Sequence, residues 1–408
     1  MGRSNKAKQA TVFQAPDGWQ LWHHPAPESW GWEFLLYSDS AIRGTPYYSS
    51  EETLGPWLFF PTGADPDGPR VTAQLAVRSL HAHPLPGWQV DPRVLGPSDP
   101  GYKGTADWYT GQSGDDEVAS LLSVALGVRL RSGGMIRQFR VGPGEDPAGL
   151  PTFHDHRPPV LAHTPIDRMQ VSGLFGAEVP LAPGLELLGR YPLLTPTQAV
   201  ALVKAAKHYA DALWIANSDP EQAWLRLVTA IEVVADLEKP DTADPSVLFS
   251  VKFEASAELI RAAGGEDLLA RVAQEITGVD GATKKFLGFM AKYSPGPPPG
   301  ERPKDENHQV DWDRLDRAMT QIYTYRSRFL HSGSPFPVSM GMTILDRDDD
   351  GVLPECPDRD GSYGTQNSHW GPGSAPMHLW VFAYITREAL MSWWREHATS
   401  NTVEPPPR

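Results

Sequence analysis

The chain has 408 residues, of which 40% are hydrophobic and 10% aromatic, so it is not a disordered protein and can bury cores for two or three domains. Its formal net charge of −14 argues against broad, non-specific affinity for nucleic acid or anionic membranes. The single cysteine, Cys356, excludes an internal disulfide and a Cys-x-x-Cys metal site, which fits a reducing cytoplasm.

The first half of the chain has the pattern of a mixed domain. Residues 1–10 are polar and basic, and we expect a disordered tail rather than a signal or an anchor. From residue 11 to about 95, short apolar runs alternate with Pro, Gly and Asp, which predicts several β-strands. Residues 115–130 have helical spacing, and residues 135–141 then have the pattern of a strand. We therefore predict an α+β, β-rich N-terminal domain over residues 11–190.

The pattern becomes helical near residue 195. Thr195 can cap a helix and Pro196 can occupy its first turn. Two amphipathic helices follow in quick succession, and Glu232 lies on the flank of the second. These helices and the later ones predict an all-α bundle over residues 195–397.

Three further features belong to this second half. A long loop insert is expected near residues 334–375, and residues 398–408 are expected to be a disordered tail. The most apolar window, residues 377–394, is interrupted by Arg387 and Glu388, so we expect a buried core helix and no membrane span.

An arginine falls on the apolar stripe of the helix expected at about residues 311–330. The sequence YRSRFLHSG ends this helix, and Arg326 lies within the stripe, between Leu315, Met319 and Ile322 on one side and Phe329 and Leu330 on the other. A buried guanidinium is costly unless an anion meets it. We therefore expect an anionic group beside Arg326 in the folded protein.

Arg326 and His331 form an RxxxxH pattern late in the predicted bundle. With Glu232 in an earlier helix, this pattern resembles the HEPN superfamily, especially its Apea-like branch, over roughly residues 195–397. The resemblance implies a metal-independent endoribonuclease that needs no cofactor and forms its site between two chains of a homodimer. It also implies a toxin or an antiviral effector against phage, with the N-terminal domain as a sensor of a phage or cellular trigger, or as a regulator.

The residue types suit cleavage of RNA by its own 2′-hydroxyl. Histidine can move protons near neutral pH, and the arginine fork can hold two phosphate oxygens without losing its charge. We expect His331 to be the general acid or base and Arg326 the phosphate clamp. Glu232 would orient Arg326, and Ser327 would add a second polar contact.

Two other functions remain open. Arg-x4-His also occurs in ordinary helices, and five residues rotate His331 by about 140° from Arg326. The pair would then be structural, in a non-catalytic HEPN-like module that binds a nucleotide, RNA or a protein. The second alternative is a calcium-responsive binding protein.

The calcium alternative rests on an acidic loop. Asp346, Asp348, Asp350 and Gly351 have the DxDxDG spacing of a calcium loop. The twelfth position of such a loop needs Glu, but here it is Pro357, so we expect a solvated loop. A Pro-rich loop also gathers conceivable metal ligands that we expect to be surface residues, namely His154, Asp155, His156 and His163. We therefore predict no metal site.

Overall fold

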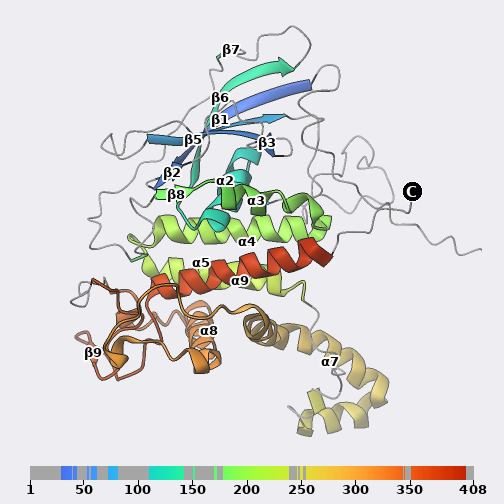
Figure 1. Ribbon diagram of the computed structural model, residues 1–408. Helices are drawn as coiled ribbons and strands as arrows, with labels where there is room; N and C mark the ends of the chain where they lie inside the picture. The colour runs from blue at the N-terminus through green and yellow to red at the C-terminus, as the bar shows by residue number, and fades with distance from the viewer. Residues whose placement is uncertain are drawn as a thin grey trace, which may run out of the picture.

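The protein is a mixed α+β structure in which a sheet covers one end of a stack of helices (Figure 1). The computed structural model describes residues 29–38, 40–43, 53–54, 57–61, 72–80, 110–141, 150–151, 170–171, 178–238, 246, 249–250, 254–342, 344 and 351–400. The predicted α+β class is confirmed at this level. The predicted tail at residues 1–10 lies outside the described residues.

The sheet forms from the apolar runs of the first half. Six antiparallel strands have the order β3-β4-β5-β1-β6-β7, with bounds Thr53–Leu54, Trp57–Pro61, Thr72–Leu80, Ser29–Ser38, Arg131–Val141 and Leu150–Pro151. A separate parallel pair joins β2 (Ala41–Arg43) to β8 (Glu178–Pro180). Strands β1, β4 and β5 lie between residues 11 and 95, where the apolar runs predicted strands, so the prediction is confirmed for these three.

Helix α2 (Gly114–Leu126) connects the sheet to the helices. It lies between them, beside α3 (Ala182–Leu188), and its apolar residues are buried (Figure 1). The short helix η5 (Tyr191–Leu193) then leads to the predicted start of the helical half.

The two predicted amphipathic helices are α4 (Pro196–Ile215) and α5 (Pro220–Ala235). The predicted cap is present: Gln198 N donates to the Thr195 hydroxyl, and Thr195 N donates to the Gln198 side chain. The last helix, α9 (Leu379–Ser400), crosses both (Figure 1).

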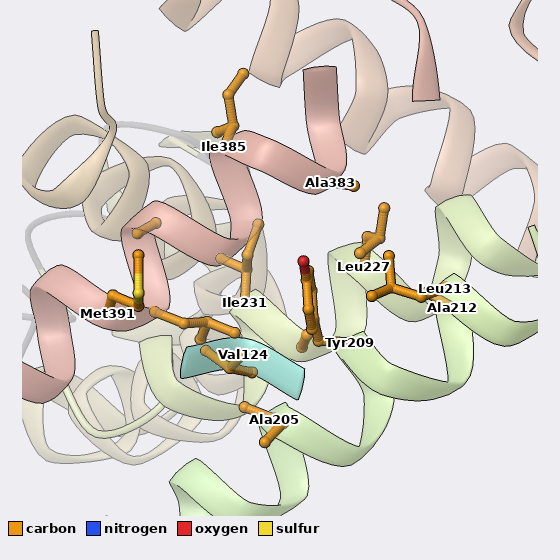
Figure 2. Packing of buried hydrophobic residues seen from close by; sticks show 14 of the residues in the cluster. Val124, Ala205, Tyr209, Ala212, Leu213, Leu227, Ile231, Ala383, Ile385 and Met391 are labelled. Carbon is orange, nitrogen blue, oxygen red and sulfur yellow. The ribbon is translucent and has the colours of Figure 1, made fainter. Parts of the chain in front are cut away.

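One hydrophobic core joins these helices. Val124 of α2, Tyr209 of α4, Ile231 of α5 and Met391 of α9 converge within it (Figure 2). The same core continues from Phe34 in β1 to residues of α9, so it crosses the boundary predicted between residues 190 and 195. The boundary itself stays a prediction.

Helix α7 (Glu254–Tyr293) extends from the body as an arm (Figure 1). The chain breaks helical geometry at Gly264 and Gly265, where Gly265 has a φ of 71° that favours glycine. Phe249, Ala257, Leu269 and Ala273 form a small separate core there. Beyond these two glycines the helix continues to Tyr293.

The chain between α7 and α9 carries short elements around α8 (Leu315–Ser332). They are η6 (Glu306–His308), η7 (Trp312–Arg314), η8 (Val338–Met340), β9 (Tyr363–Gly364) and β10 (His369–Trp370). Glu355 fastens the predicted insert to the body, because its buried carboxylate accepts from Arg302 at 2.8 and 2.7 Å and from Val310 N at 2.7 Å.

The C-terminal tail begins later than expected. Helix α9 continues to Ser400, so the tail predicted from residue 398 is wrong at its start, because apolar burial extends to Ala398. Residues 401–408 lie outside the described residues. Within the described part of the chain, every helix is too short or too polar to cross a membrane.

Candidate functional site

Helix α8 places the RxxxxH pattern at the edge of the helical stack. Leu315, Met319 and Ile322 are buried as predicted, and Tyr323 joins them. Leu330 is 53% exposed, so the prediction that the apolar stripe continues to this residue is wrong. In the last turn of α8 only Phe329 still packs against the core, and the three residues after it are exposed.

Arg326 and Glu232 form an ion pair between α8 and α5. Arg326 Nη2 donates to Glu232 Oε2 at 2.7 Å, and the two side chains are only 20% and 17% exposed. Tyr323 Oη donates to the other carboxylate oxygen at 2.9 Å. The expected contact between Arg326 and Glu232 is therefore present, and both oxygens of the carboxylate are engaged.

The ion pair between Arg326 and Glu232 also interacts with the side chain of Tyr323. Burial and the hydrogen bond to Glu232 raise the pKa of Tyr323 to about 12, so the phenol stays a donor. The guanidinium carbon of Arg326 lies 5.5 Å from the centre of the Tyr323 ring. Arg326 Nε is buried and makes no hydrogen bond with any described residue, so one donor remains unsatisfied.

His331 lies apart from the ion pair. It is exposed in the last turn of α8 and makes no hydrogen bond or ion pair with the described residues. Gly333, with a φ of 65°, then ends the helix, and its N–H donates to Phe329 O. The structure thus brings Glu232 and Arg326 together but not His331, and Ser327 is partly exposed on the same helix.

A second arginine lies closer to His331 along the helix surface. Arg328 precedes His331 by three residues, so the two side chains are neighbours on one face. Both are exposed, in a stripe that also contains Arg317, Thr320 and Thr324. The RxxxxH pattern selects Arg326 and leaves out Arg328. The three-residue spacing between Arg328 and His331 already indicated in the sequence that these two side chains are neighbours.

The end of α8 is held by aromatic contacts. Phe336, just beyond the helix, has its ring centre 5.8 Å from that of Phe329 and 6.3 Å from that of Trp224. Phe336 N donates to Glu221 Oε1 at 2.9 Å. The turn that carries His331 is therefore fixed to α5 although its outer face is open.

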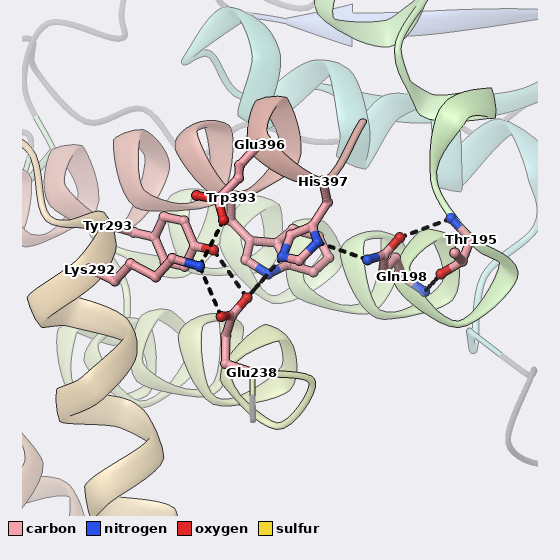
Figure 3. A network of polar contacts seen from close by, with 8 residues as sticks. All are labelled: Thr195, Gln198, Glu238, Lys292, Tyr293, Trp393, Glu396 and His397. Atoms are coloured by element: carbon pink, nitrogen blue, oxygen red, sulfur yellow. Dashed lines mark hydrogen bonds and ion pairs between the residues drawn. The ribbon is translucent and has the colours of Figure 1, made fainter. Parts of the chain in front are cut away.

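A network of polar contacts around Glu238 and His397 lies just beyond the C-terminal end of α5 (Figure 3). Glu238 accepts hydrogen bonds from His397 Nε2 at 2.8 Å, Trp393 Nε1 at 2.9 Å and Tyr293 Oη at 3.1 Å, and it pairs with Lys292 at 3.2 Å. These hydrogen bonds outweigh the effect of burial and lower the pKa of Glu238.

The helix cap of α4 determines which ring nitrogen of His397 carries the proton. Thr195 N can only donate, so Gln198 must present its oxygen there and its amide N–H to His397 Nδ1, at 2.8 Å. Nδ1 therefore accepts, and Nε2 carries the proton that it donates to Glu238. Both ring nitrogens are occupied, so His397 has a structural role and no nitrogen for proton transfer.

Other candidate reactive groups are buried. Burial and the nearby His308 lower the pKa of His378 to about 3, and burial raises the pKa of Cys356 to about 11. The described residues contain no group of three His, Cys, Asp or Glu that could hold a metal ion. The acidic loop with Asp346, Asp348 and Asp350 and the histidine loop at residues 154–163 lie outside the described residues.

Comparisons with known proteins give no relative. No family model matches the chain. No curated protein matches it, and no solved structure does. The functional argument therefore rests on the site itself.

Proposed function

We propose that this protein is a metal-independent endoribonuclease of HEPN type that acts as a homodimer. The observation that supports this most is the environment of Arg326, a permanently charged side chain that a carboxylate holds at 2.7 Å on the same helix as the exposed His331. A phosphate can compete for such a guanidinium, because its oxygens offer the same two-point contact as a carboxylate.

The proposed reaction needs only side chains and the RNA. The 2′-oxygen attacks the adjacent phosphorus, and the bond from phosphorus to the 5′-oxygen breaks, which leaves a 2′,3′-cyclic phosphate and a 5′-hydroxyl. His331 takes the 2′ proton or supplies the proton to the 5′-oxygen. Arg326, oriented by Glu232 with Ser327 beside it, would hold the charge that develops on the phosphate oxygens.

A second chain completes the proposed site. On an ideal helix His331 lies about 140° around the axis from Arg326. A partner that packs on the exposed stripe of α8 would bring its own His331 or Arg328 toward Arg326 of the first chain. In this proposal the N-terminal domain senses the trigger of a cytoplasmic toxin or antiphage effector.

Cleavage of labelled RNA in the presence of EDTA tests the proposal. We expect the wild-type chain to give 2′,3′-cyclic ends, and we expect His331→Ala and Arg326→Ala to lose at least about 100-fold in rate. The matched control is His369→Ala, which removes another exposed histidine and should keep the rate. If wild type and His331→Ala leave the RNA equally intact under conditions that activate the system, the nuclease proposal fails.

One observation favours a second candidate function. Both oxygens of Glu232 are occupied by Arg326 and Tyr323, as expected for a structural ion pair in a non-catalytic module that binds a nucleotide, RNA or a protein. Such a module would bind RNA in the assay above and leave it intact.

A further inference from the structure

Three cationic side chains from β6, α4 and α5 gather around Asp211 of α4, and the proposed reaction uses none of them. Lys207 Nζ and Arg226 Nη1 both contact Asp211 Oδ2, at 2.8 and 3.0 Å. Arg131 Nη2 lies 3.7 Å from Asp211 Oδ1. One carboxylate is thus shared by three cationic side chains from three different elements.

A tryptophan borders this cluster. The guanidinium carbons of Arg129 and Arg131 each lie 5.0 Å from the centre of the Trp214 ring. Trp214 Nε1 donates to Leu130 O at 3.2 Å, which fixes the ring against the start of β6. Trp214 is only partly buried, so the ring borders both the cations and solvent.

The donors of the cluster outnumber its acceptors. A guanidinium carries five N–H donors and an ammonium three, whereas Asp211 offers two oxygens. Arg131, Lys207 and Arg226 have side chains that are 45%, 33% and 38% exposed, so their remaining donors can reach a ligand. Arg226 Nε is buried and makes no hydrogen bond with a described residue.

The neighbouring carboxylates are already engaged with serines. Asp115 accepts from the hydroxyl of Ser132, and Asp116 accepts from that of Ser113 at 2.9 Å. Burial and the charge of Asp115 raise the pKa of Asp116, whereas Arg131 and Lys207 act in the opposite direction. Serine hydroxyls are neutral, so the three carboxylates of Asp115, Asp116 and Asp211 count against the four cations when Arg129 is included, and the cluster keeps a formal excess of one positive charge.

The charges of this cluster also act on His208. Burial and the charges of Arg226 and Lys207 lower the pKa of His208, although Asp211 acts in the opposite direction. The imidazole thus stays neutral beside the cluster, and its buried Nδ1 makes no hydrogen bond with the described residues.

We propose that Arg131, Lys207 and Arg226, arranged around Asp211 and Trp214, bind backbone phosphates of single-stranded RNA. Two guanidinium groups and an ammonium suit phosphate oxygens, and a bordering aromatic ring suits an unstacked base. A net charge of −14 would repel a long duplex, so a short flexible strand held at one local site fits best.

This site is distinct from the proposed cleavage site. Arg226 and Glu232 are six residues apart on α5, which places them about 120° apart around the helix axis. Arg226 faces α4 and Glu232 faces α8. Phosphate binding at the cluster does not depend on cleavage; only the choice of RNA as the ligand rests on the proposed function.

Fluorescence anisotropy with a labelled ten-nucleotide 2′-O-methyl RNA tests the proposal on the full chain. This probe lacks the attacking hydroxyl, so wild-type protein can be used. Contacts with three phosphates predict a slope of about −2 in log affinity against log salt concentration. Arg131→Gln with Lys207→Gln should weaken binding at least about tenfold at low salt and reduce the slope to about −0.7.

The matched control is Arg43→Gln with Arg190→Gln, which removes two exposed arginines from ion pairs with Glu178 and Glu186. It should keep the wild-type affinity within about twofold. A further variant, Asp211→Asn, removes the competing carboxylate and should tighten binding, whereas a purely structural cluster predicts no gain.

Three outcomes overturn the proposal. They are a wild-type chain with no salt-dependent binding, a cluster variant that binds as tightly as the control pair, and binding of inorganic pyrophosphate without binding of the oligonucleotide. The proposed cleavage is measured separately on unmodified RNA with His331→Ala. Either proposal can therefore fail while the other stands.

Discussion

Arg326 and Glu232 join α8 to α5 through a 2.7 Å hydrogen bond, and the second oxygen of the same carboxylate accepts from Tyr323. This arrangement accounts for the arginine on the apolar stripe of α8. The guanidinium is largely removed from water, but it is paired. The contact with Glu232 that stabilises the guanidinium in the resting protein therefore competes with any phosphate that binds it.

Loss of the carboxylate charge should destabilise the fold. Glu232→Gln keeps an oxygen for Tyr323 but leaves Arg326 with an uncompensated charge, and we expect a loss of about 1–3 kcal/mol in the free energy of unfolding, less than for a fully buried pair. Urea denaturation measures it. The matched control, Glu178→Gln, breaks the exposed pair with Arg43 and should cost less than about 1 kcal/mol. Equal losses would contradict the role assigned to burial.

Two inactive chains should complement each other if the nuclease site is shared. In a twofold dimer, co-expressed Arg326→Ala and His331→Ala chains give about half heterodimers, each with one complete site. We expect about a quarter of wild-type cleavage from the mixture and none from either variant alone. An inactive mixture, with heterodimers confirmed by mass spectrometry, would contradict a site built from both chains.

Glu238 should make stability depend on acid pH. Its folded pKa is lowered, because hydrogen bonds from His397, Lys292 and Tyr293 outweigh burial. A carboxylate of this kind stabilises the fold above its unfolded pKa, about 4.3, and loses that contribution as pH falls through the lower folded value. Glu396 also faces Lys292, at 2.7 Å, so it belongs to the same network.

Thermal unfolding from pH 7 to pH 3 measures this dependence. Glu238→Gln should lower the melting temperature at pH 7 and should reduce the further loss between about pH 4.3 and pH 3. The control, Glu186→Gln, changes an exposed carboxylate on α3 and should keep the wild-type pH profile. An unchanged profile in Glu238→Gln would show that other carboxylates set the acid sensitivity.

Local patterns predicted the parts of the fold that depend on neighbours in sequence. Thr195 and Pro196 marked the start of α4, and the spacing placed Glu232 on the flank of α5 and Arg326 on the apolar stripe of α8. The same periodicity failed at Leu330, because it describes one face of a helix and not the point at which the helix leaves the core.

Contacts between distant segments had no such signal. Glu238 and His397 are 159 residues apart, and no helical or strand period connects them. Arg387 appeared in the sequence only as a charge that interrupts an apolar window. In the structure it donates to Val124 O at 2.7 Å and Ala125 O at 2.8 Å, so it satisfies carbonyls at the end of α2.

A substitution at Gly127 measures how strongly hydrogen bonds hold the side chain of Arg387 in place. Gly127 ends α2 with a φ of 70°, and a Cβ there would lie 2.9 Å from Arg387 Nε. Gly111 has a φ of 74° but has no heavy atom within 4 Å of such a Cβ. Gly111→Ala should therefore cost only the left-handed backbone term, about 1–2 kcal/mol.

Gly127→Ala should cost more than this control. The arginine cannot move away without losing hydrogen bonds to two helix carbonyls, so we expect an additional loss of about 1–3 kcal/mol in the free energy of unfolding. Urea denaturation of the two variants gives the difference directly. Equal losses at Gly127 and Gly111 would mean that Arg387 yields freely, and the contact between α2 and α9 would then contribute little to stability.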